Sequence, residues 1–381
     1  MSQHVVLSFG LGIDSTGILV RWLTDPSSRD FPLSALTVLV SQLGDEYPDT
    51  YRDLNQVILP MLHRHRVRLV QVARPALSIA RGGPRYVVLD DRTSDHRLVR
   101  RGPVRYSDEL RRNGTIPQLS NRRCSLRWKG EVLDAWIADN MPPGFTHVLG
   151  YDAGEQTRSH RDAGIIRHGR RPDYPLQRWG WHRDTTRQFL HDVTGRWFNR
   201  SCCAQCPFQT EWASRWRSHP QSGADALLLE YTALALNPRM RLFGRHSAWS
   251  LASGHQLDEV IAAARARIAA APWAGYEVRR TFSRPNAALR SVRTLTVGTR
   301  AAVRAAVAAT TARHLDTDPL GVVRAWLRPA TSGYPRAEHL IVAAPAGVAD
   351  KERPAFARTW NALQPTSDAI DSDAAYCTVT G

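Results

Sequence analysis

The stretch HVVLSFGLGIDST, residues 4–16, decides the fold. It begins as a short apolar run with the length of a buried strand, and it ends in a glycine-rich turn that opens a helical pattern over residues 17–23. Glycines in such a turn let backbone N–H groups approach a phosphate closely, and the helix N-terminus favours an anion. Three interpretations stay open: a dinucleotide-binding turn, in which Ser15 occupies the place of the third glycine, a capped turn without a ligand, and a pyrophosphate-binding loop of another type.

The alternation of apolar runs and helical patterns continues beyond this stretch. Residues 36–40, 67–72 and 146–149 have the composition of strands, and residues 50–63 have helical spacing. Such alternation predicts an α/β fold with a doubly wound parallel sheet, which binds ligands beyond the carboxyl ends of its strands. Residues 81–117 are polar and interrupted by Gly and Pro, which predicts an irregular insertion or a flap over the sheet edge.

The second half of the chain has a different texture. Residues 222–237 and 253–271 have helical patterns, and from residue 279 an arginine-rich segment precedes short strand-like runs and an alanine-rich helix. We therefore expect three parts: a nucleotide-binding domain with a cysteine cluster over residues 1–221, a helical extension over residues 222–278, and a small, basic α+β module over residues 279–381.

The composition bounds the class of protein. With 43% hydrophobic residues in 381, the chain can bury a sizeable core, which excludes disorder as its main state. The formal net charge of +16 favours a polyanionic partner such as a nucleic acid. The only lysines are Lys129 and Lys351. Neither follows a glycine, and this excludes a Walker-type phosphate loop.

The chain lacks the signals of membrane insertion and export. No apolar stretch approaches the roughly 18–20 residues that span a bilayer. Residues 1–8 lack the basic start and the long apolar run of a secretory signal. The 5 cysteines are too few for a disulfide scaffold at this length. We therefore expect a cytoplasmic protein that does not contact a membrane.

The glycine-rich turn resembles the PP-loop of the ATP pyrophosphatases, the adenine nucleotide alpha hydrolase-like superfamily. In the register GLGIDS, residues 10–15, Gly10 stands at the first Ser of the S-G-G-x-D-S signature and Leu11 at a Gly, so the motif is degenerate. Its form S-F-G-x-G-x-D-S-T is similar to that of the phosphoadenylyl-sulfate (PAPS) reductase-like branch. Three further segments follow in the family's order: an acidic turn, GDEYPDT (44–50); a Cys and Lys element, RRCSLRWK (122–129); and a Glu and Arg segment, LGYDAGEQTRSHR (149–161).

The resemblance implies that ATP binds and that a substrate oxygen attacks its α-phosphate with release of pyrophosphate, assisted by Mg²⁺. It implies catalytic roles for Asp14, Lys129, Arg158 and Arg161. For the acidic turn, a role in capping the next helix stays open beside nucleotide contact. The residues assigned to the nucleotide are Ser8, Gly10, Gly12, Ile13, Asp14, Ser15, Thr16, Asp45, Glu46, Gly150 and Glu155.

The cysteines have the spacing of metal ligands. The segment SCCAQCPF, residues 201–208, contains Cys202 and a C-x-x-C pair, Cys203 and Cys206. Together with the distant Cys124 they suit Zn²⁺ or a [4Fe–4S] cluster equally by number. The resemblance favours [4Fe–4S], because related sulfur-handling proteins hold such a cluster with a Cys and a C-x-x-C pair. Neighbouring cysteines do not easily direct both thiolates at one ion, so we expect Cys202 to be an additional ligand.

These observations predict an ATP-dependent enzyme that adenylates its substrate and carries out iron–sulfur-dependent sulfur transfer or nucleotide modification on a nucleic acid. The expected partners are ATP, a nucleic acid such as tRNA or DNA, a sulfur-donor protein and a second copy of the chain. One alternative is a PAPS reductase-type enzyme. However, the residues around Cys377, AYCTV (375–379), do not match the E-C-G-[IL]-H motif of true reductases. We therefore expect Cys377 to be incidental. The other alternative is a non-catalytic accessory protein that binds nucleic acid.

Overall fold

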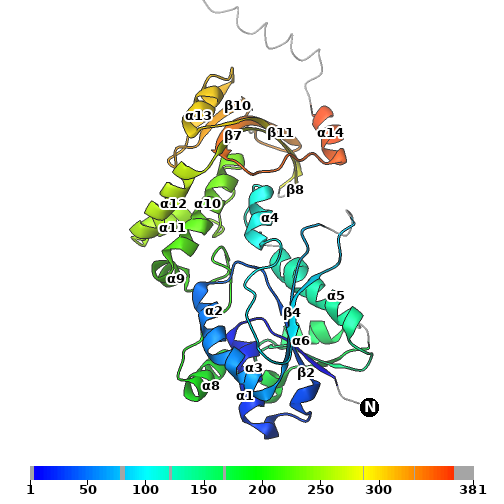
Figure 1. Ribbon diagram of the computed structural model, residues 1–381. Coiled ribbons are helices and arrows are strands. Elements are labelled where there is room, and N and C mark those ends of the chain that lie inside the picture. Colours follow the sequence, from blue (N-terminus) through cyan, green and yellow to red (C-terminus); the bar gives the residue numbers. More distant parts are fainter. Residues whose placement is uncertain are drawn as a thin grey trace, which may run out of the picture. The chain divides into compact units, whose positions relative to one another are not determined.

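The computed structural model describes residues 4–77, 82–119, 122–165, 169–285, 287–329 and 331–363. The chain forms two compact units (Figure 1). The first comprises Met1–Glu109 and Pro117–Gly223, and the second comprises Leu110–Ile116 and Ala224–Gly381. Within the described ranges, no helix is both long enough and apolar enough to cross a membrane.

The first unit contains a six-stranded sheet in the order β4-β3-β2-β1-β5-β6. All neighbouring strands are parallel except β3 and β4. The strand β1 is central: β2 and β3 follow on one side of it, and β5 and β6 lie on its other side. The predicted α/β class with a mostly parallel sheet is confirmed. The strands are β1 Val5–Ser8, β2 Leu36–Ser41, β3 Arg68–Ala73, β4 Val87–Arg92, β5 Thr146–Val148 and β6 Arg171–Asp173.

The segments between these strands are mostly helical. The residues predicted as one helix over 50–63 form a continuous α–π–α run from Pro48 to His65. The α-helices up to residue 218 are α1 Ile13–Thr24, α2 Pro48–Asp53, α3 Leu59–His65, α4 Tyr106–Arg112, α5 Glu131–Asn140, α6 Gln156–Ala163, α7 Pro175–Arg178, α8 Arg183–Thr194 and α9 Trp212–Ser218. The 3₁₀ turns are η1 Pro26–Ser28 and η2 Leu33–Ala35, and the π-helical turns are η3 Leu54–Ile58 and η5 Cys124–Gly130.

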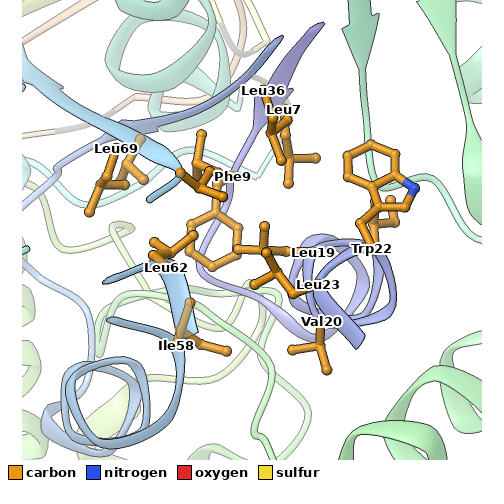
Figure 2. Close-up of a cluster of buried hydrophobic side chains, with 14 of the residues drawn as sticks. Leu7, Phe9, Leu19, Val20, Trp22, Leu23, Leu36, Ile58, Leu62 and Leu69 are labelled. Atoms are coloured by element: carbon orange, nitrogen blue, oxygen red, sulfur yellow. The ribbon is translucent and has the colours of Figure 1, made fainter. Parts of the chain in front are cut away.

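Side chains that alternate along the strands form two hydrophobic layers, one on each face of the sheet. Leu7 and Val5 of β1 belong to one cluster, together with residues of α1 and α3, and Figure 2 shows Leu7 and Phe9 close to Leu19 of α1. Val6 belongs to a second cluster with residues of α5. Each fully buried aliphatic side chain stabilises the fold by about 1.5–3 kcal/mol. The two layers hold the carboxyl end of β1, where the glycine-rich turn begins.

The prediction of an irregular segment over residues 81–117 is wrong in two places. Residues Val87–Arg92 form β4, an antiparallel edge strand on β3, and Tyr106–Arg112 form α4. The charged residues of β4 conceal its strand character in the sequence. Asp91 accepts two hydrogen bonds from Arg68 of β3, at 2.7 and 2.8 Å, and edge strands commonly carry such charges.

The second unit contains a five-stranded antiparallel sheet in the order β8-β7-β11-β10-β9. The boundary that we expected at residue 279 falls inside β7, which begins at Trp273. The arginine-rich segment that follows is a long hairpin of β7 and β8. The strands are β7 Trp273–Arg284, β8 Ala287–Gly298, β9 His314–Thr317, β10 Val323–Arg328 and β11 Arg336–Pro345, and the helices are α10 Pro220–Leu236, α11 Ala248–Gly254, α12 Asp258–Ala270, α13 Arg300–Ala308 and α14 Pro354–Asn361.

Several arginines of the hairpin have partners inside this unit. Arg279 pairs with Glu352 at 2.9 Å, and Arg293 pairs with Glu277 at 3.1 Å. Arg290 donates to the backbone carbonyl of Gly114 at 3.0 Å. The number of arginines in this segment therefore does not by itself require an external anion.

Candidate functional site

The glycine-rich turn joins the end of β1 to the first turn of α1 and is held by its own hydrogen bonds. The hydroxyl of Ser15 accepts from the backbone N–H of Gly10 at 3.2 Å and donates to the carbonyl of Gly12 at 3.4 Å. Gly12 is the extended N-cap of α1, and Leu11 lies in the left-handed region with φ of 60°. Leu11 stands where the PP-loop signature has a glycine, the residue that adopts this conformation without steric cost. The backbone at Leu11 thus has a conformation that is common for glycine and rare for a residue with a side chain.

The side chains of this turn differ in what they can reach. Those of Ile13 and Thr16 are buried in the core, and the backbone N–H of Thr16 donates to the carbonyl of Gly12 at 3.0 Å. A Cβ added to Gly10 would have only the hydroxyl of Ser15 nearby, at 4.0 Å. Space for a ligand is therefore open at Gly10, whereas Ile13 and Thr16 serve the packing of α1.

Gly150, at the end of β5, lies directly against the start of α1. A Cβ on Gly150 would be 2.9 Å from the backbone nitrogen of Ser15, closer than real Cβ contacts allow. Only glycine therefore permits this approach. The structure thus places Gly150 against the backbone of Asp14 and Ser15.

Asp14 is bound by an arginine that the sequence did not single out. The guanidinium of Arg183, the first residue of α8, donates to Oδ2 of Asp14 at 2.9 Å and lies 3.5 Å from Asp152. Burial raises the pKa of Asp14, although the bond from Arg183 acts against this shift. Glu155 is close enough to add its negative charge to this group. Three carboxylates and one guanidinium thus meet at the N-terminus of α1.

The two arginines assigned to catalysis lie on exposed positions of α6. Arg158 forms an ion pair with Glu155, and its guanidinium lies 4.5 Å from the ring centre of Tyr151. Arg161 is one helical turn further on and is also exposed. The structure therefore connects Arg158 to the carboxylate group through Glu155, and it shows no contact between Arg161 and the glycine-rich turn among the described residues.

The two carboxylates of the acidic turn face different partners. Asp45 is bound by the backbone and hydroxyl of Ser107, each at 2.6 Å, and by Gln205 at 3.0 Å. Glu46 is buried and lies 3.4 Å from the amine of Lys129. Asp45 thus holds loops together, whereas Glu46 is paired with the cation that the sequence singled out.

A cavity of about 160 Å³ gathers the cysteines. Cys124 enters it from η5, and the other three enter from the segment of residues 202–206. Glu46 and Lys129 line the same cavity. All four cysteines are free thiols. Among the described residues, no group of three or more His, Cys, Asp or Glu side chains is arranged around one point as metal ligands, so the thiols share a cavity without forming a closed ligand set.

Burial controls the ionisation of these thiols and of the nearby lysine. It raises the pKa of Cys202 to about 12, and it also raises those of Cys203 and Cys206. Burial alone would lower the pKa of Lys129, but the charge of Glu46, which also accepts a hydrogen bond from the amine, acts against this effect, and the pKa is raised. At neutral pH the lysine is therefore charged, and Cys202, Cys203 and Cys206 are protonated. A bound metal ion would deprotonate them, because thiolates are the ligating form.

Ser201 connects the cysteine segment with the glycine-rich turn. Its hydroxyl lies 2.9 Å from the carbonyl oxygen of Gly10 and 3.1 Å from a carboxylate oxygen of Glu46. A Cβ on Gly12 would lie 3.5 Å from the Cβ of Ser201. The turn and the thiol cavity therefore adjoin each other at Ser201.

A buried arginine supports the cysteine segment. Arg215 of α9 donates to Asp49 at 2.7 Å and to the sulfur of Cys202 at 3.4 Å, and its guanidinium lies 3.7 Å from the ring centre of Tyr47. The pKa of Asp49 is lowered, because the charge of Arg215 and hydrogen bonds outweigh the effect of burial. The sequence missed Arg215, since nothing marks one arginine among so many. The sequence showed only its partners, Asp49 and Thr50, which belong to the acidic turn.

The hydroxyl of Ser8 is oriented by a buried histidine. His147 of β5 lies between Ser8, 2.8 Å from Nε2, and Arg170, 3.1 Å from Nδ1. Burial, reinforced by the charge of Arg170, lowers the pKa of His147 to about 4. Because arginine can only donate, Nδ1 accepts and the proton is on Nε2, which donates to Ser8. The hydroxyl hydrogen of Ser8 is then available to another acceptor.

Neutral His147 makes stability depend on pH. Its pKa is near 6.5 when exposed and about 4 in the fold, so between these values the unfolded chain binds more protons and stability falls as the pH drops. The slope from this group approaches about 1.4 kcal/mol per pH unit. Chemical denaturation between about pH 6.5 and 4 should show a shallower fall for His147→Gln than for the wild type. Equal slopes would contradict a neutral, buried His147.

Comparisons with known proteins add no relative, because no protein-family model, curated protein or solved structure matches the chain.

Proposed function

We propose that this protein is an ATP-dependent adenylating enzyme of the PP-loop type, with a doubly wound, adenine nucleotide alpha hydrolase-like nucleotide-binding domain. The observation that carries the proposal is the contact of Ser201 with both Gly10 and Glu46, which joins the glycine-rich turn to the thiol cavity. The strand order supports it, since it reverses between β1 and β5 beside this turn. Ligands of doubly wound sheets bind at such reversals.

In the proposed reaction, a substrate oxygen forms a bond to the α-phosphorus of ATP. The bond from that phosphorus to the oxygen bridging to the β-phosphate breaks, and its electron pair leaves with pyrophosphate. Backbone N–H groups at the start of α1 would stabilise the leaving charge, and Lys129 would neutralise phosphate oxygens. Arg158 and Arg161 would reach the nucleotide from α6.

Mg²⁺ would neutralise and orient the phosphates. In nucleotide sites this ion is held by one or two carboxylates together with phosphate oxygens and water. Asp14, Asp152 and Glu155 provide such carboxylates near the start of α1. Arg183 holds Asp14 in place and limits the negative charge of the group when no ion is bound.

For the cysteines we propose a [4Fe–4S] cluster on Cys124, Cys203 and Cys206, with Zn²⁺ as the alternative. Free thiols lining one cavity are a suitable donor set for either group. The thiol of Cys202 already contacts Arg215 at 3.4 Å and Gln209 at 3.9 Å, so we propose it as an additional ligand and not as one of the principal three. The cluster would supply the capacity to carry sulfur to the activated substrate.

The substrate that we propose is a nucleic acid, tRNA or DNA, and the net charge of +16 supports this choice. A sulfur-donor protein and a second copy of the chain are the further partners of the proposal. A PAPS reductase-type activity is the second candidate, and Cys377, which bears on it, lies outside the described residues. A non-catalytic, nucleic-acid-binding role is the third.

Pyrophosphate release tests the proposal. The purified protein should release pyrophosphate from ATP when tRNA or DNA is added. In Gly10→Ala the added methyl group enters open space, so the fold should persist. The rate of pyrophosphate release should fall at least tenfold, because the methyl group takes the place of a phosphate. Gly254→Ala, where a Cβ meets nothing within 4 Å, is the matched control. Pyrophosphate release that does not change when nucleic acid is added would count against the proposal, and so would equal activity of the two variants. Sulfite formation that depends on a thiol would select the PAPS reductase-type activity.

Iron counting after anaerobic reconstitution tests the ligand assignment. Cys124→Ser, Cys203→Ser and Cys206→Ser should each lose most of the bound iron and its visible absorbance. Cys202→Ser should retain most of it, because this thiol is held by Arg215. Equal iron loss in all four variants would make Cys202 a full ligand. Stoichiometric zinc in place of iron would select the alternative metal.

A further inference from the structure

Three arginines share one carboxylate on the sheet of the second unit. Glu338 of β11 is 0% exposed and pairs with Arg280 of the neighbouring strand β7 at 2.5 Å. Arg239, which follows α10, lies 3.0 Å from the same carboxylate, and Arg336 lies 3.7 Å from it. The cluster therefore has two more positive charges than negative ones.

Part of the hydrogen-bonding capacity of this cluster is unused. The Nε–H groups of Arg280 and Arg336 are buried and have no acceptor among the described residues. The side chains of these arginines are 4% and 10% exposed. Burial lowers the pKa of Arg280 to about 10; Glu338 acts against this shift, and the charges of neighbouring arginines add to it. The surplus positive charge favours an anion at the exposed arginine of the cluster, Arg239.

Two aromatic rings, those of Phe282 and Tyr334, lie beside the arginines of this cluster. The guanidinium of Arg336 lies 4.8 Å from the ring centre of Phe282 and 4.8 Å from that of Tyr334. Tyr334 is 43% exposed, and the side chain of Arg239 is 54% exposed. Cations beside an exposed ring are the arrangement that single-stranded nucleic acids require, since arginine binds the phosphates and the ring stacks on a base.

We propose that this cluster, Arg239, Arg280, Arg336, Glu338, Phe282 and Tyr334, is a binding site for single-stranded nucleic acid. Arg239 and Arg336 contact backbone phosphates, and Tyr334 stacks on a base. Arg280 stays paired with Glu338 and holds the site in the sheet. The proposal deepens the nucleic-acid part of the proposed function, but binding is measured without ATP, so its failure is distinguishable from a failure of pyrophosphate release.

Fluorescence anisotropy with a labelled single-stranded oligonucleotide tests this site in the full chain. Tyr334→Ala should weaken binding about tenfold, the effect of losing one stacked base. Arg239→Glu should weaken it at least as much and should reduce the dependence of log K on log salt by about 0.7 for the lost phosphate contact. Arg265→Glu, an equal charge change at an exposed position of α12, should change affinity less than twofold.

Each other outcome contradicts the site. An equal loss in Arg239→Glu and Arg265→Glu would show that only net charge matters. An unchanged affinity in Tyr334→Ala, with the far-ultraviolet circular dichroism of the wild type, would remove the stacking contact. Full competition by millimolar inorganic phosphate would identify a small-anion site rather than a nucleic-acid site. The absence of oligonucleotide binding by the wild type at low salt would overturn the proposal altogether.

Discussion

Replacing Glu338 by glutamine should lower the free energy of unfolding by about 3–5 kcal/mol, because removing one partner of a buried ion pair leaves the other charge uncompensated. Glu338 is fully buried and is the carboxylate that Arg280, Arg336 and Arg239 share. Glutamine keeps the shape of the side chain and removes the charge, so packing stays nearly constant. Urea unfolding followed by tryptophan fluorescence measures the loss.

Glu277→Gln is the matched control for this substitution. Glu277 belongs to the same sheet. It lies 2.9 Å from His339, a hydrogen bond that the amide oxygen of glutamine can keep, and its ion-pair partner Arg293 is largely exposed. Such a pair contributes about 0–1 kcal/mol, so the control should unfold almost like the wild type. A loss below about 1 kcal/mol in Glu338→Gln would show that solvent or a bound anion compensates the arginines.

Replacing Lys129 by methionine should lower the rate of pyrophosphate release by about 10²–10³-fold, the usual effect of removing one group that stabilises developing charge. Lys129 is held 3.4 Å from Glu46 in the thiol cavity, and its pKa is raised, so the charge persists at neutral pH. Methionine keeps the length of the side chain. The effect should appear in kcat, with ATP affinity changed less.

Two further variants of the chain make this result specific. Lys351→Met removes the other lysine, which is exposed in the second unit, and should leave the rate unchanged. Lys129→Met also leaves the buried Glu46 without its cation, so the double variant Lys129→Met/Glu46→Gln separates stability from catalysis. Restored stability without restored release, together with normal release by Glu46→Gln alone, would support a catalytic lysine. Restored release would make the lysine a structural counterion.

The sequence predicted the parts of the fold in which hydrophobic pattern and function coincide. The strand in residues 4–8, its glycine-rich turn and the cysteines were recognisable because each has a local pattern with a chemical reason. The edge strand β4 and the hairpin of β7 and β8 were not, because charged side chains interrupt their alternation. Several of these side chains pair with partners that are distant in the sequence, as Arg279 does with Glu352.

The partners of the candidate site show the same limit. Asp14 and Gly150 could be proposed from their motifs, but Arg183 and Arg215 could not. Their roles depend on where α8 and α9 place them against Asp14 and Cys202. In a chain this rich in arginine, composition does not distinguish a buried guanidinium from a solvated one.

Leu11 has a consequence for the affinity of the glycine-rich turn. Its left-handed backbone has a conformational cost of roughly 1–2 kcal/mol in a residue with a side chain, yet that side chain is buried in the core. A glycine at position 11 would relieve the backbone strain, but it would remove the side chain that packs in the core. The turn is therefore already ordered before any ligand arrives, and a phosphate that binds it does not bear the entropy loss of immobilising a mobile segment.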